Sequence, residues 1–545
     1  MFSKILKLLN TLKYLRFEQI FFRIVYRFKK ISVLPIREKI KTKSWQWNGP
    51  RIYKQSLFKD NKVRFLSSNG RIDSPASWNC DRKDKLWLYN LHYFDDLNSS
   101  TFKERTDLQA IFFDKWIDEN PPCLGNGWEP YPLSLRIVNL VKWLSCHPKV
   151  KMHWLNSLMQ QASALSQQIE YHISGNHLFA NAKALIFVGT YINNDEAQRY
   201  FELGLKLLDR EIPEQFLDDG AHFELSPMYH VILLWDLLEL FDLAKTCNNK
   251  ILIERTSNWK TVAQKSLHWL SNMQHPDGEI SFFNDSSLGI AAEPAKVFEY
   301  ATNLGLQWRQ TETALETLSD SGYTRINKGN YTMIFDHANV GPDYLPGHSH
   351  ADTLSFEISI DKQRVFINSG TSIYGLSDER IRQRKTPAHN TVSIESHDSS
   401  QVWSGFRVAK RAYSKLEKAK IENNKVILVA SHDGFLKQAP KTRHKRQLEC
   451  GNKNIVIDDI LSKKVNACFH LHVHPDVVVK RQSNNLVKFS VRGKFICTLE
   501  SSLPLDIVDS TWHPEFGKSI QNKKIKIPFS NGTLKTTIHL NSDPQ

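Results

Sequence analysis

Two histidines stand two positions apart in the segment 346–352, which reads PGHSHAD. On an extended chain the side chains of residues i and i+2 point to the same side, so His348 and His350 would share one face. Two imidazoles on one face can share a metal ion, or one can act as a base while the other binds metal. A third imidazole, His389, stands at the start of a later predicted strand. The HxH pair alone is equally compatible with two structural histidines.

Asn176 and His177 stand at the predicted N-terminus of a long apolar helix, in the segment 174–178, SGNHL. The first backbone N–H groups of a helix and its dipole favour an anion. An amide and an imidazole at this place therefore predict a site for a carboxylate. The alternative is that Ser174 and Asn176 only cap the helix.

Tyr229 and His230 follow the dipeptide Ser226-Pro227, which is a strong helix start signal. Both side chains would lie in the first turn of that helix. Most tyrosines are core or interface residues, but a tyrosine beside cations that lower its pKa can act as a general acid or base. Glu224 lies just upstream, and we expect Glu224 and His230 to contact a substrate at this site.

Two further segments combine aromatic rings with arginine. Trp128 and Arg136 stand in the segment 127–136, and Trp403 and Arg407 are the ends of the segment WSGFR, which contains a flexible glycine. Aromatic rings suit the C–H faces of sugars, and a guanidinium group can bind a carboxylate or sulfate through two hydrogen bonds. We predict that these four side chains bind neighbouring sugars, with packing at a helix start as the alternative for the first pair.

Two kinds of pattern divide the chain. From about residue 100 to 310, segments of helical length follow one another with dense apolar content. From about residue 325 onward, short runs rich in β-branched and aromatic residues alternate with turn residues, which is typical of an antiparallel β-sandwich. A run of helices followed by a run of strands predicts an α+β multidomain chain rather than a doubly wound sheet. The predicted domains are a basic helical extension over 1–84, a helical domain over 85–310 and a β-sandwich over 325–545.

The positive charge is concentrated at one end of the chain. The net charge is +15 for 545 residues, and residues 1–60 hold fifteen Lys and Arg against three Asp and Glu. No nucleic-acid-binding module is recognisable, so we predict no nucleic-acid partner. Residues 1–30 mix apolar and basic side chains, which predicts an amphipathic helix that either packs on the domain or rests on an anionic membrane surface.

Other signals exclude common classes of protein. Charges interrupt the N-terminal apolar residues every few positions, so no cleaved signal peptide is predicted. We therefore expect a cytoplasmic or membrane-associated location, or a periplasmic one if the substrate is a finished polymer. The seven cysteines form no CxxC pair and predict isolated thiols. No Walker loop, GxGxxG, HExxH or GxSxG motif is present, so nucleotide hydrolysis, dinucleotide chemistry and hydrolase-elbow chemistry lack support.

The motifs together resemble the heparinase II/III-like polysaccharide lyases and the related alginate lyase group. The matching segments are GNHL at Asn176, DGAHFELSPMYH around Tyr229, GHSHADTLSFE at His348, FINSGT at Asn368 and AHNTV at His389. They occur in the order of the family, and the resemblance covers about residue 85 to the C-terminus. It implies an incomplete α/α toroid followed by an antiparallel β-sandwich.

The resemblance also implies a reaction. These lyases cleave the glycosidic bond at O4 of a uronic acid by β-elimination and leave a 4,5-unsaturated sugar. By position, Asn176 and His177 would hold and neutralise the uronate carboxylate. Tyr229 would protonate the leaving O4 oxygen and, in some members, also take the C5 proton. His348 would act as the base for one of the two C5 epimers.

A structural zinc ion in some relatives raises the question of a metal. His350 and His389 match two of its ligands, and Asn368 stands where those relatives have Asp. A neutral amide is a poor zinc ligand beside imidazole, thiolate or carboxylate, so zinc binding stays an open alternative. The reaction itself implies no cofactor.

The expected partner is an acidic polysaccharide, with membrane contact through the basic N-terminus as a further possibility. That N-terminus resembles the members encoded among bacterial surface polysaccharide synthesis functions, which implies processing of an acidic surface glycan. One alternative is a non-catalytic protein of polysaccharide assembly that binds acidic glycan. Another is a glycoside hydrolase, which requires two facing carboxylates such as Asp219, Glu224 or Asp285. The sequence does not predict the oligomeric state.

Overall fold

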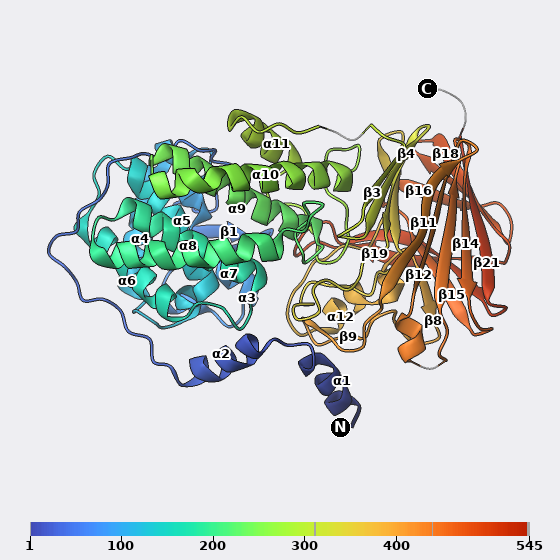
Figure 1. Cartoon of the computed structure of the whole chain (residues 1–545), viewed down its shortest axis with the longest axis horizontal. Coiled ribbons are helices and arrows are strands. Elements are labelled where there is room, and N and C mark those ends of the chain that lie inside the picture. The colour runs from blue at the N-terminus through green and yellow to red at the C-terminus, as the bar shows by residue number, and fades with distance from the viewer. Residues whose placement is uncertain (1, 310–311, 439, 542–545) are drawn as a thin grey trace.

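The computed structural model of the chain describes residues 2–309, 312–438 and 440–541. A helical domain comes first in the sequence and a β domain follows it, side by side along the long axis of the molecule (Figure 1). This order agrees with the predicted α+β multidomain class. Among the described residues, no helix is both long enough and apolar enough to cross a membrane.

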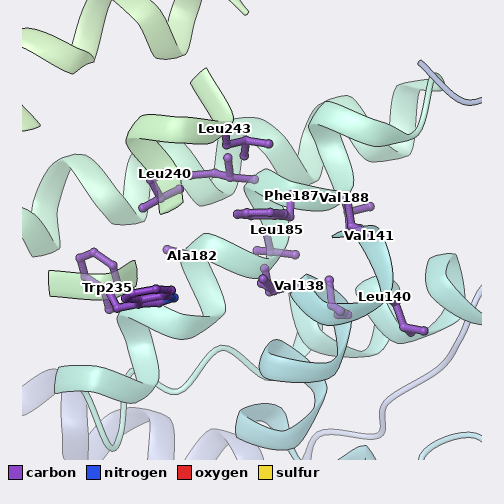
Figure 2. Close-up of a cluster of buried hydrophobic side chains, with 14 of the residues drawn as sticks. Val138, Leu140, Val141, Ala182, Leu185, Phe187, Val188, Trp235, Leu240 and Leu243 are labelled. Carbon is purple, nitrogen blue, oxygen red and sulfur yellow. The ribbon is translucent and has the colours of Figure 1, made fainter. Parts of the chain in front are cut away.

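Nine helices of the described chain form the helical domain. They are α3 (Lys85–Tyr93), α4 (Thr106–Glu119), α5 (Pro130–Cys146), α6 (Met152–Gln167), α7 (Gly175–Tyr191), α8 (Asp195–Gln215), α9 (Pro227–Thr246), α10 (Lys250–Met273) and α11 (Pro294–Asn303). Helices α5, α7 and α9 are buried on nearly every face and lie inside the array, as expected for inner helices. Figure 2 shows their side chains, among them Val138, Leu185 and Leu240, meeting in one buried cluster.

The N-terminal extension lies outside this helical array. It begins with α1 (Phe2–Leu12) and α2 (Phe17–Phe28) and continues as irregular chain to the hairpin of β1 (Lys62–Phe65) and β2 (Ser68–Arg71). Short 3-10 helices occur at η1 (Pro75–Asn79), η2 (Asp95–Asn98), η3 (Phe102–Arg105), η4 (Asn126–Trp128), η5 (Thr386–Ala388) and η6 (Gly434–Lys437).

Three antiparallel sheets build most of the β domain. The first has the strands β3 (Leu315–Leu318), β4 (Tyr323–Lys328), β5 (Tyr331–Asp336), β6 (Phe356–Ile360) and β7 (Gln363–Phe366) in sequence order. The second has the order β11-β12-β13-β14-β21-β18-β17-β16, and the third the order β19-β20-β15-β8. Side chains of all three sheets, such as Phe356, Leu428 and Phe469, meet in one core.

The remaining strands complete the β domain, with the short hairpin β9-β10 and the helix α12 on its side. Their bounds are β8 (Val392–Ile394), β9 (Val402–Trp403), β10 (Arg407–Val408), β11 (Ser414–Glu422), β12 (Lys425–His432), β13 (His444–Cys450), β14 (Asn454–Leu461), β15 (Ala467–His472), β16 (Val477–Arg481), β17 (Leu486–Val491), β18 (Lys494–Ser501), β19 (Asp506–Trp512), β20 (Ile520–Phe529) and β21 (Thr533–Leu540), with α12 at Asp378–Arg384. Burial alternates along strands such as β13, as expected where one face packs on a core.

The β domain starts earlier than residue 325, where we expected it. The strand β3 already pairs with β4 from Leu315 onward. Its side chains are mostly half-buried, so the strand lacks the apolar run that would reveal it in the sequence. The predicted domain limits at residues 1, 310 and 545 lie outside the described residues.

Buried polar contacts fix the two domains to each other. His275, which follows α10, binds Glu357 of β6 through Nε2 at 2.9 Å. Arg364 of β7 donates to Asp277 and to the carbonyl of Ile280. His275, Asp277 and Ile280 lie just before the loop that carries Asp285, so the loop has a fixed position between the helices and the sheets.

Candidate active site

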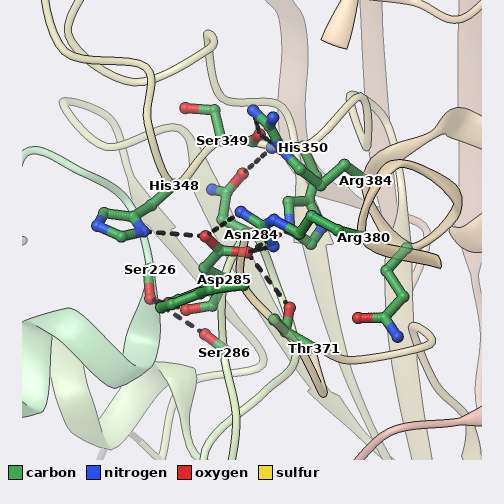
Figure 3. A network of polar contacts seen from close by, with 12 residues as sticks. Ser226, Asn284, Asp285, Ser286, His348, Ser349, His350, Thr371, Arg380 and Arg384 are labelled. Carbon is green, nitrogen blue, oxygen red and sulfur yellow. Dashed lines mark hydrogen bonds and ion pairs between the residues drawn. The ribbon is translucent and has the colours of Figure 1, made fainter. Parts of the chain in front are cut away.

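The predicted catalytic residues meet at the junction of the two domains. The helical domain contributes the first turns of α7 and α9 and the loop around Asp285. The β domain contributes the loop around His348 and the segment that leads into α12. Figure 3 shows Ser226, Asp285, His348 and Arg380, which come from four separate stretches of chain, around one polar network.

His348 is oriented by a buried carboxylate. Its Nδ1 lies 2.9 Å from Oδ2 of Asp285, and since a carboxylate only accepts, Nδ1 carries the proton. Its Nε2 lies 3.6 Å from Oε2 of Glu224, which is too long for a hydrogen bond. The side chain of His348 is 12% exposed. With the proton on Nδ1, Nε2 is the nitrogen that can present a lone pair, as a general base requires.

Asp285 is the centre of this network (Figure 3). Both terminal nitrogens of the Arg380 guanidinium donate to its two oxygens, and Nε2 of His350 lies 2.8 Å from Oδ1. Burial alone would raise the pKa of Asp285, but Arg380 and the hydrogen bonds from His348 and His350 hold that pKa well below its usual range. Asp285 is thus a permanent anion that fixes the ring of His348.

Tyr229 stacks on His348, with ring centroids 3.9 Å apart and an interplanar angle of 31°. The Ser226 side chain caps α9 by accepting from the Tyr229 backbone N–H, which sets Tyr229 in the first turn as expected. The Tyr229 hydroxyl lies 3.1 Å from the hydroxyl of Tyr374. Burial raises the pKa of Tyr229 well above its ordinary value, so the phenol stays protonated and can serve as an acid.

Asn176 and His177 begin α7 at the same junction. The backbone N–H of Asn176 donates to Oε1 of Glu224 at 3.3 Å. Nδ1 of His177 lies 2.9 Å from Oε1 of the buried Glu170, and its ring lies 4.3 Å from that of Tyr131. Burial lowers the pKa of His177, but the Glu170 carboxylate outweighs burial and the pKa is raised. A histidine whose pKa is raised, at a helix N-terminus, suits an anionic ligand.

Glu224 lies between these two groups, close to the Asn176 N–H and to His348. Burial is the largest influence on this carboxyl group and raises its pKa. A carboxyl group that holds its proton can donate a hydrogen bond to another carboxylate. The predicted contact of Glu224 with a substrate is therefore chemically reasonable at this position.

Three predicted substrate-binding residues are buried away from the site, and for these the expectation is wrong. Arg136 donates to the side chain of Gln161 and to the carbonyls of His92 and Gly127, so its guanidinium is satisfied inside the helical domain. Trp128 is buried and donates to the carbonyl of Asn120. Arg136 packs in the core because α5 buries nearly all its faces, and Trp128 is buried at the end of η4, just before that helix.

The prediction that His230 contacts a substrate is wrong for a similar reason. Both its ring nitrogens have protein partners, the backbone N–H of His222 and the carbonyl of Ser266. The ring stacks on Trp269 at 4.3 Å. His230 follows Tyr229 in the helix, but the turn of the helix directs it into the core.

Trp403 and Arg407 lie on the hairpin β9-β10, beside the N-terminal helix. Nε1 of Trp403 donates to Oγ1 of Thr11 in α1, and the guanidinium of Arg407 lies 5.0 Å from the Trp403 ring. Of this hairpin it is Phe406, 41% exposed, whose ring lies beside His348 at 6.0 Å. The sugar-binding role of Trp403 and Arg407 stays a prediction.

The three residues expected at a zinc site lie together, but their chemistry does not fit zinc. Nδ1 of His350 and Nε2 of His389 are buried and have no hydrogen-bond partner in the described chain. Oδ1 of Asn368, however, already accepts from the Ser355 hydroxyl at 2.7 Å. Among the described residues, no group of three or more His, Cys, Asp and Glu side chains could hold a metal ion. Two imidazoles and an engaged amide form a weaker donor set than structural zinc requires.

The structure also brings three residues to the site that our sequence reasoning did not single out. Tyr374 and Arg380 follow the FINSGT motif and contact Tyr229 and Asp285. Glu170 precedes the SGNHL segment and orients His177. The only signal for Tyr374 was a tyrosine in a glycine-containing loop next to a matched motif, and a buried arginine gives no signal in the sequence.

Models of known families match the chain over two adjoining ranges. The heparinase II/III N-terminus matches residues 12–304, and the heparinase II/III-like C-terminal region matches residues 310–541. The chain belongs to the heparinase II/III-like family. The resemblance in the sequence motifs is thereby confirmed.

Curated relatives and solved structures of this family extend the comparison. The chain is 25% identical over 398 residues to a heparin-sulfate lyase of Pedobacter heparinus, which covers 66% of this chain and 57% of that protein. It is 24% identical over 413 residues to a heparin-sulfate lyase of Bacteroides thetaiotaomicron, with 66% and 56% covered. The chain therefore spans little more than half the length of these curated relatives.

A crystal structure of heparinase III aligns with a TM-score of 0.68 at 16% identity, over 96% of this chain and 89% of that chain. The heparan sulfate lyase structure from Pedobacter heparinus aligns with a TM-score of 0.57 at 18% identity, over 89% and 82%. At such identities the likeness concerns the fold. The predicted architecture, an α/α toroid followed by a β-sandwich, is confirmed for this heparinase II/III-like chain.

Proposed function

We propose that the protein is a polysaccharide lyase that cleaves a uronic-acid-containing acidic polysaccharide by β-elimination. The observation that carries the proposal is the stacking of Tyr229 on His348, with His348 bound to Asp285 through Nδ1. This arrangement sets a protonated phenol beside an imidazole whose Nε2 can accept a proton. Membership of the family, and relatives named heparin-sulfate lyases, support the same chemistry.

In the proposed reaction, Nε2 of His348 takes the C5 proton of the uronate. The electron pair of the C5–H bond forms the C4=C5 double bond as the C4–O4 bond breaks. The Tyr229 hydroxyl gives its proton to O4, so the products are an unsaturated uronate and a new hydroxyl on the departing chain. Proton transfer from the imidazolium to the phenolate restores both side chains.

The C5 proton becomes acidic enough for this step only when the neighbouring carboxylate is neutralised. We assign this role to His177, Asn176 and Glu224. The raised pKa of His177 supports this role. Burial favours the protonated form of Glu224, which supports it as well. The charge that develops on the carboxylate oxygens would meet hydrogen-bond donors that are already in position.

The two alternative functions have weaker support. A hydrolase needs two carboxyl groups free to face a sugar. Asp285 is engaged by Arg380, and Asp219 accepts from the hydroxyl and backbone N–H of Ser321. A protein that only binds glycan has no need for the oriented imidazole beside a buried phenol.

The experiment that tests the function is an assay of elimination on a panel of polymers. The panel contains heparan sulfate, hyaluronan, alginate and acidic glycans of bacterial surfaces, so that both C5 epimers are offered. We expect an increase in ultraviolet absorbance from the unsaturated uronate on at least one polymer, with unsaturated oligosaccharides in the mass spectrum. New reducing ends without this absorbance would indicate hydrolysis, and binding without cleavage would favour the glycan-binding alternative.

We further propose that the reaction needs no cofactor and that Asn368 has replaced a zinc ligand. The test is the zinc content of the purified protein and of the Asn368→Asp variant, after equilibration with zinc and gel filtration. A carboxylate completes a His, His, Asp set, so we expect about one zinc per chain in the variant and far less in the wild type. Stoichiometric zinc in the wild type that resists a chelator would contradict the proposal.

A further inference from the structure

The helices α1 and α2 form a strap along one edge of the molecule, beneath both domains. Figure 1 shows α1 beside α12 and β9, and α2 beneath the helical domain. At 11 and 12 residues, both are much shorter than the roughly 20 residues that span a bilayer. Any contact of these helices with a membrane would therefore lie in the plane of its surface.

The inner side of the strap contacts both walls of the candidate active site. Thr11 of α1 bonds the hairpin β9-β10 through the Val408 carbonyl and the Trp403 indole. Tyr26 of α2 donates to the carbonyl of Ile169, and Phe22 stacks on Tyr171 at 4.4 Å. On the opposite sides of both helices, large apolar side chains are exposed.

The outer side of the strap is apolar. In α2 the exposed apolar side chains follow the i, i+3, i+4, i+7 pattern of a single helix face, and α1 repeats that pattern with Leu6 as an additional exposed side chain. Phe17 is 80% exposed and Phe28 is 78% exposed. We call this surface the outer apolar stripe; it consists of Ile5, Leu8, Leu9, Leu12, Phe17, Ile20, Phe21, Ile24 and Phe28. Contiguous exposed apolar residues of this kind mark a docking surface.

Cations are interspersed in the sequence with the residues of the outer apolar stripe. Residues 1–30 contain eight Lys and Arg against one acidic residue, Glu18, and Glu18 is paired with Arg210 of α8. The exposed cations include Lys4, Lys13, Arg23, Arg27, Lys29 and Lys30. A second copy of the chain docked on this surface would bring two basic sets into contact, and such like-charge contacts are unfavourable. An anionic lipid surface satisfies both the apolar side chains and the cations.

We propose that the outer apolar stripe docks in the headgroup region of an anionic lipid bilayer, with α1 and α2 parallel to the surface. The basic side chains then meet the lipid phosphates while the apolar side chains enter the acyl boundary. Because the strap contacts both walls of the active site, docking holds the site next to glycans attached to that surface. This inference does not depend on the elimination reaction.

The test is sedimentation of the full-length protein with lipid vesicles, in the absence of any polysaccharide. One set of vesicles contains phosphatidylcholine alone, and the other also contains phosphatidylglycerol. We expect binding to the anionic vesicles that weakens as salt is added, and much weaker binding to the neutral ones. Equal binding to both sets, or none to the anionic vesicles, would overturn the proposal.

Substitutions in the stripe test its role directly. In the triple variant Phe17→Ser, Phe21→Ser, Ile24→Ser, we expect the partition coefficient to fall by at least about tenfold. The matched control Ile111→Ser, Leu124→Ser, Ile251→Ser removes exposed apolar side chains of the helical domain and should bind like the wild type. An equal loss in the control would overturn the proposal. So would a dimer in sedimentation equilibrium that only the stripe variant dissociates, because the stripe would then be a protein contact.

Discussion

Replacing Tyr229 with phenylalanine should lower kcat by about 10²- to 10⁴-fold, the range expected when a positioned proton donor is removed. The ring would still stack on His348, and the only atom lost is the hydroxyl oxygen that would protonate O4. The KM for the polymer should change little, because the phenol acts on the leaving oxygen and not on the uronate carboxylate. The measurement is the steady-state rate of unsaturated product formation on the best polymer of the panel.

Tyr374→Phe is the matched control for this variant. It removes the hydroxyl that lies 3.1 Å from that of Tyr229 and leaves the proposed donor in place. We expect a decrease of about tenfold or less, consistent with the loss of one hydrogen bond. A Tyr229→Phe variant that is no slower than the control would remove Tyr229 from the mechanism.

The pH dependence separates the roles of Tyr229 and His348. Burial raises the pKa of Tyr229 well above its ordinary value, so a phenolate is scarce near neutral pH. If His348 is the base and Tyr229 the acid, the reaction does not need the Tyr229 phenolate, so activity should not rise with formation of that phenolate at alkaline pH. A rate that keeps rising far into alkaline pH would instead indicate that Tyr229 removes the C5 proton.

The catalytic candidates could be predicted because local signals position them. Ser226-Pro227 starts a helix, which sets Tyr229 in its first turn, and the start of α7 sets Asn176 and His177 at a helix N-terminus. Such signals involve residues close together in the sequence. The helix starts that these signals predict are present in the structure because tertiary contacts stabilise them.

The sugar-binding predictions failed where burial decides the role of a side chain. Arg136 and Trp128 have the residue types that bind acidic sugars, but α5, which carries Arg136, is enclosed on nearly all sides, and Trp128 is buried in η4. The sequence pattern marks α5 as apolar without revealing that a guanidinium group is satisfied by carbonyls of other segments. Arginine at such a place contributes to packing and hydrogen bonding and does not reach a ligand.

Contacts between residues far apart in the sequence could not be predicted either. Asp285 and Arg380 come from different domains, and no periodicity connects them. We named Asp285 as a possible carboxylate of a hydrolase and did not predict its pairing with Arg380. Its actual partners depend on how the loop after α10 meets α12, which only the packing of the whole chain determines.

Asp285→Asn should destabilise the protein by about 3–5 kcal/mol, the range expected when one partner of a buried ion pair is removed. Arg380 and Asp285 are both fully buried, so the guanidinium of the variant would keep its charge without a counter-ion. His348 would also lose the carboxylate that holds its Nδ1 proton, and elimination should slow. Denaturant unfolding of the two proteins measures the change in stability.

The lowered pKa of Asp285 in the folded protein gives a second test, the dependence of stability on pH. Its pKa in the folded protein lies well below the ordinary value of 3.8, so the ionised group stabilises the fold above that pH. This stabilisation is lost as the pH falls towards the depressed pKa. The stability of the Asp285→Asn variant should therefore decline less in acid than that of the wild type.

Asp343→Asn is the matched control for the charge effect. Asp343 pairs with the buried Arg411 at 3.0 Å, but its own side chain is 46% exposed. Solvent can compensate the loss of this carboxylate, so we expect a change of about 1 kcal/mol or less. If Asp285→Asn were as mild as this control, Arg380 would have to find water or another acceptor in the variant. Asp285 would then serve mainly to orient His348, and the loss would appear in kcat while the free energy of unfolding stayed unchanged.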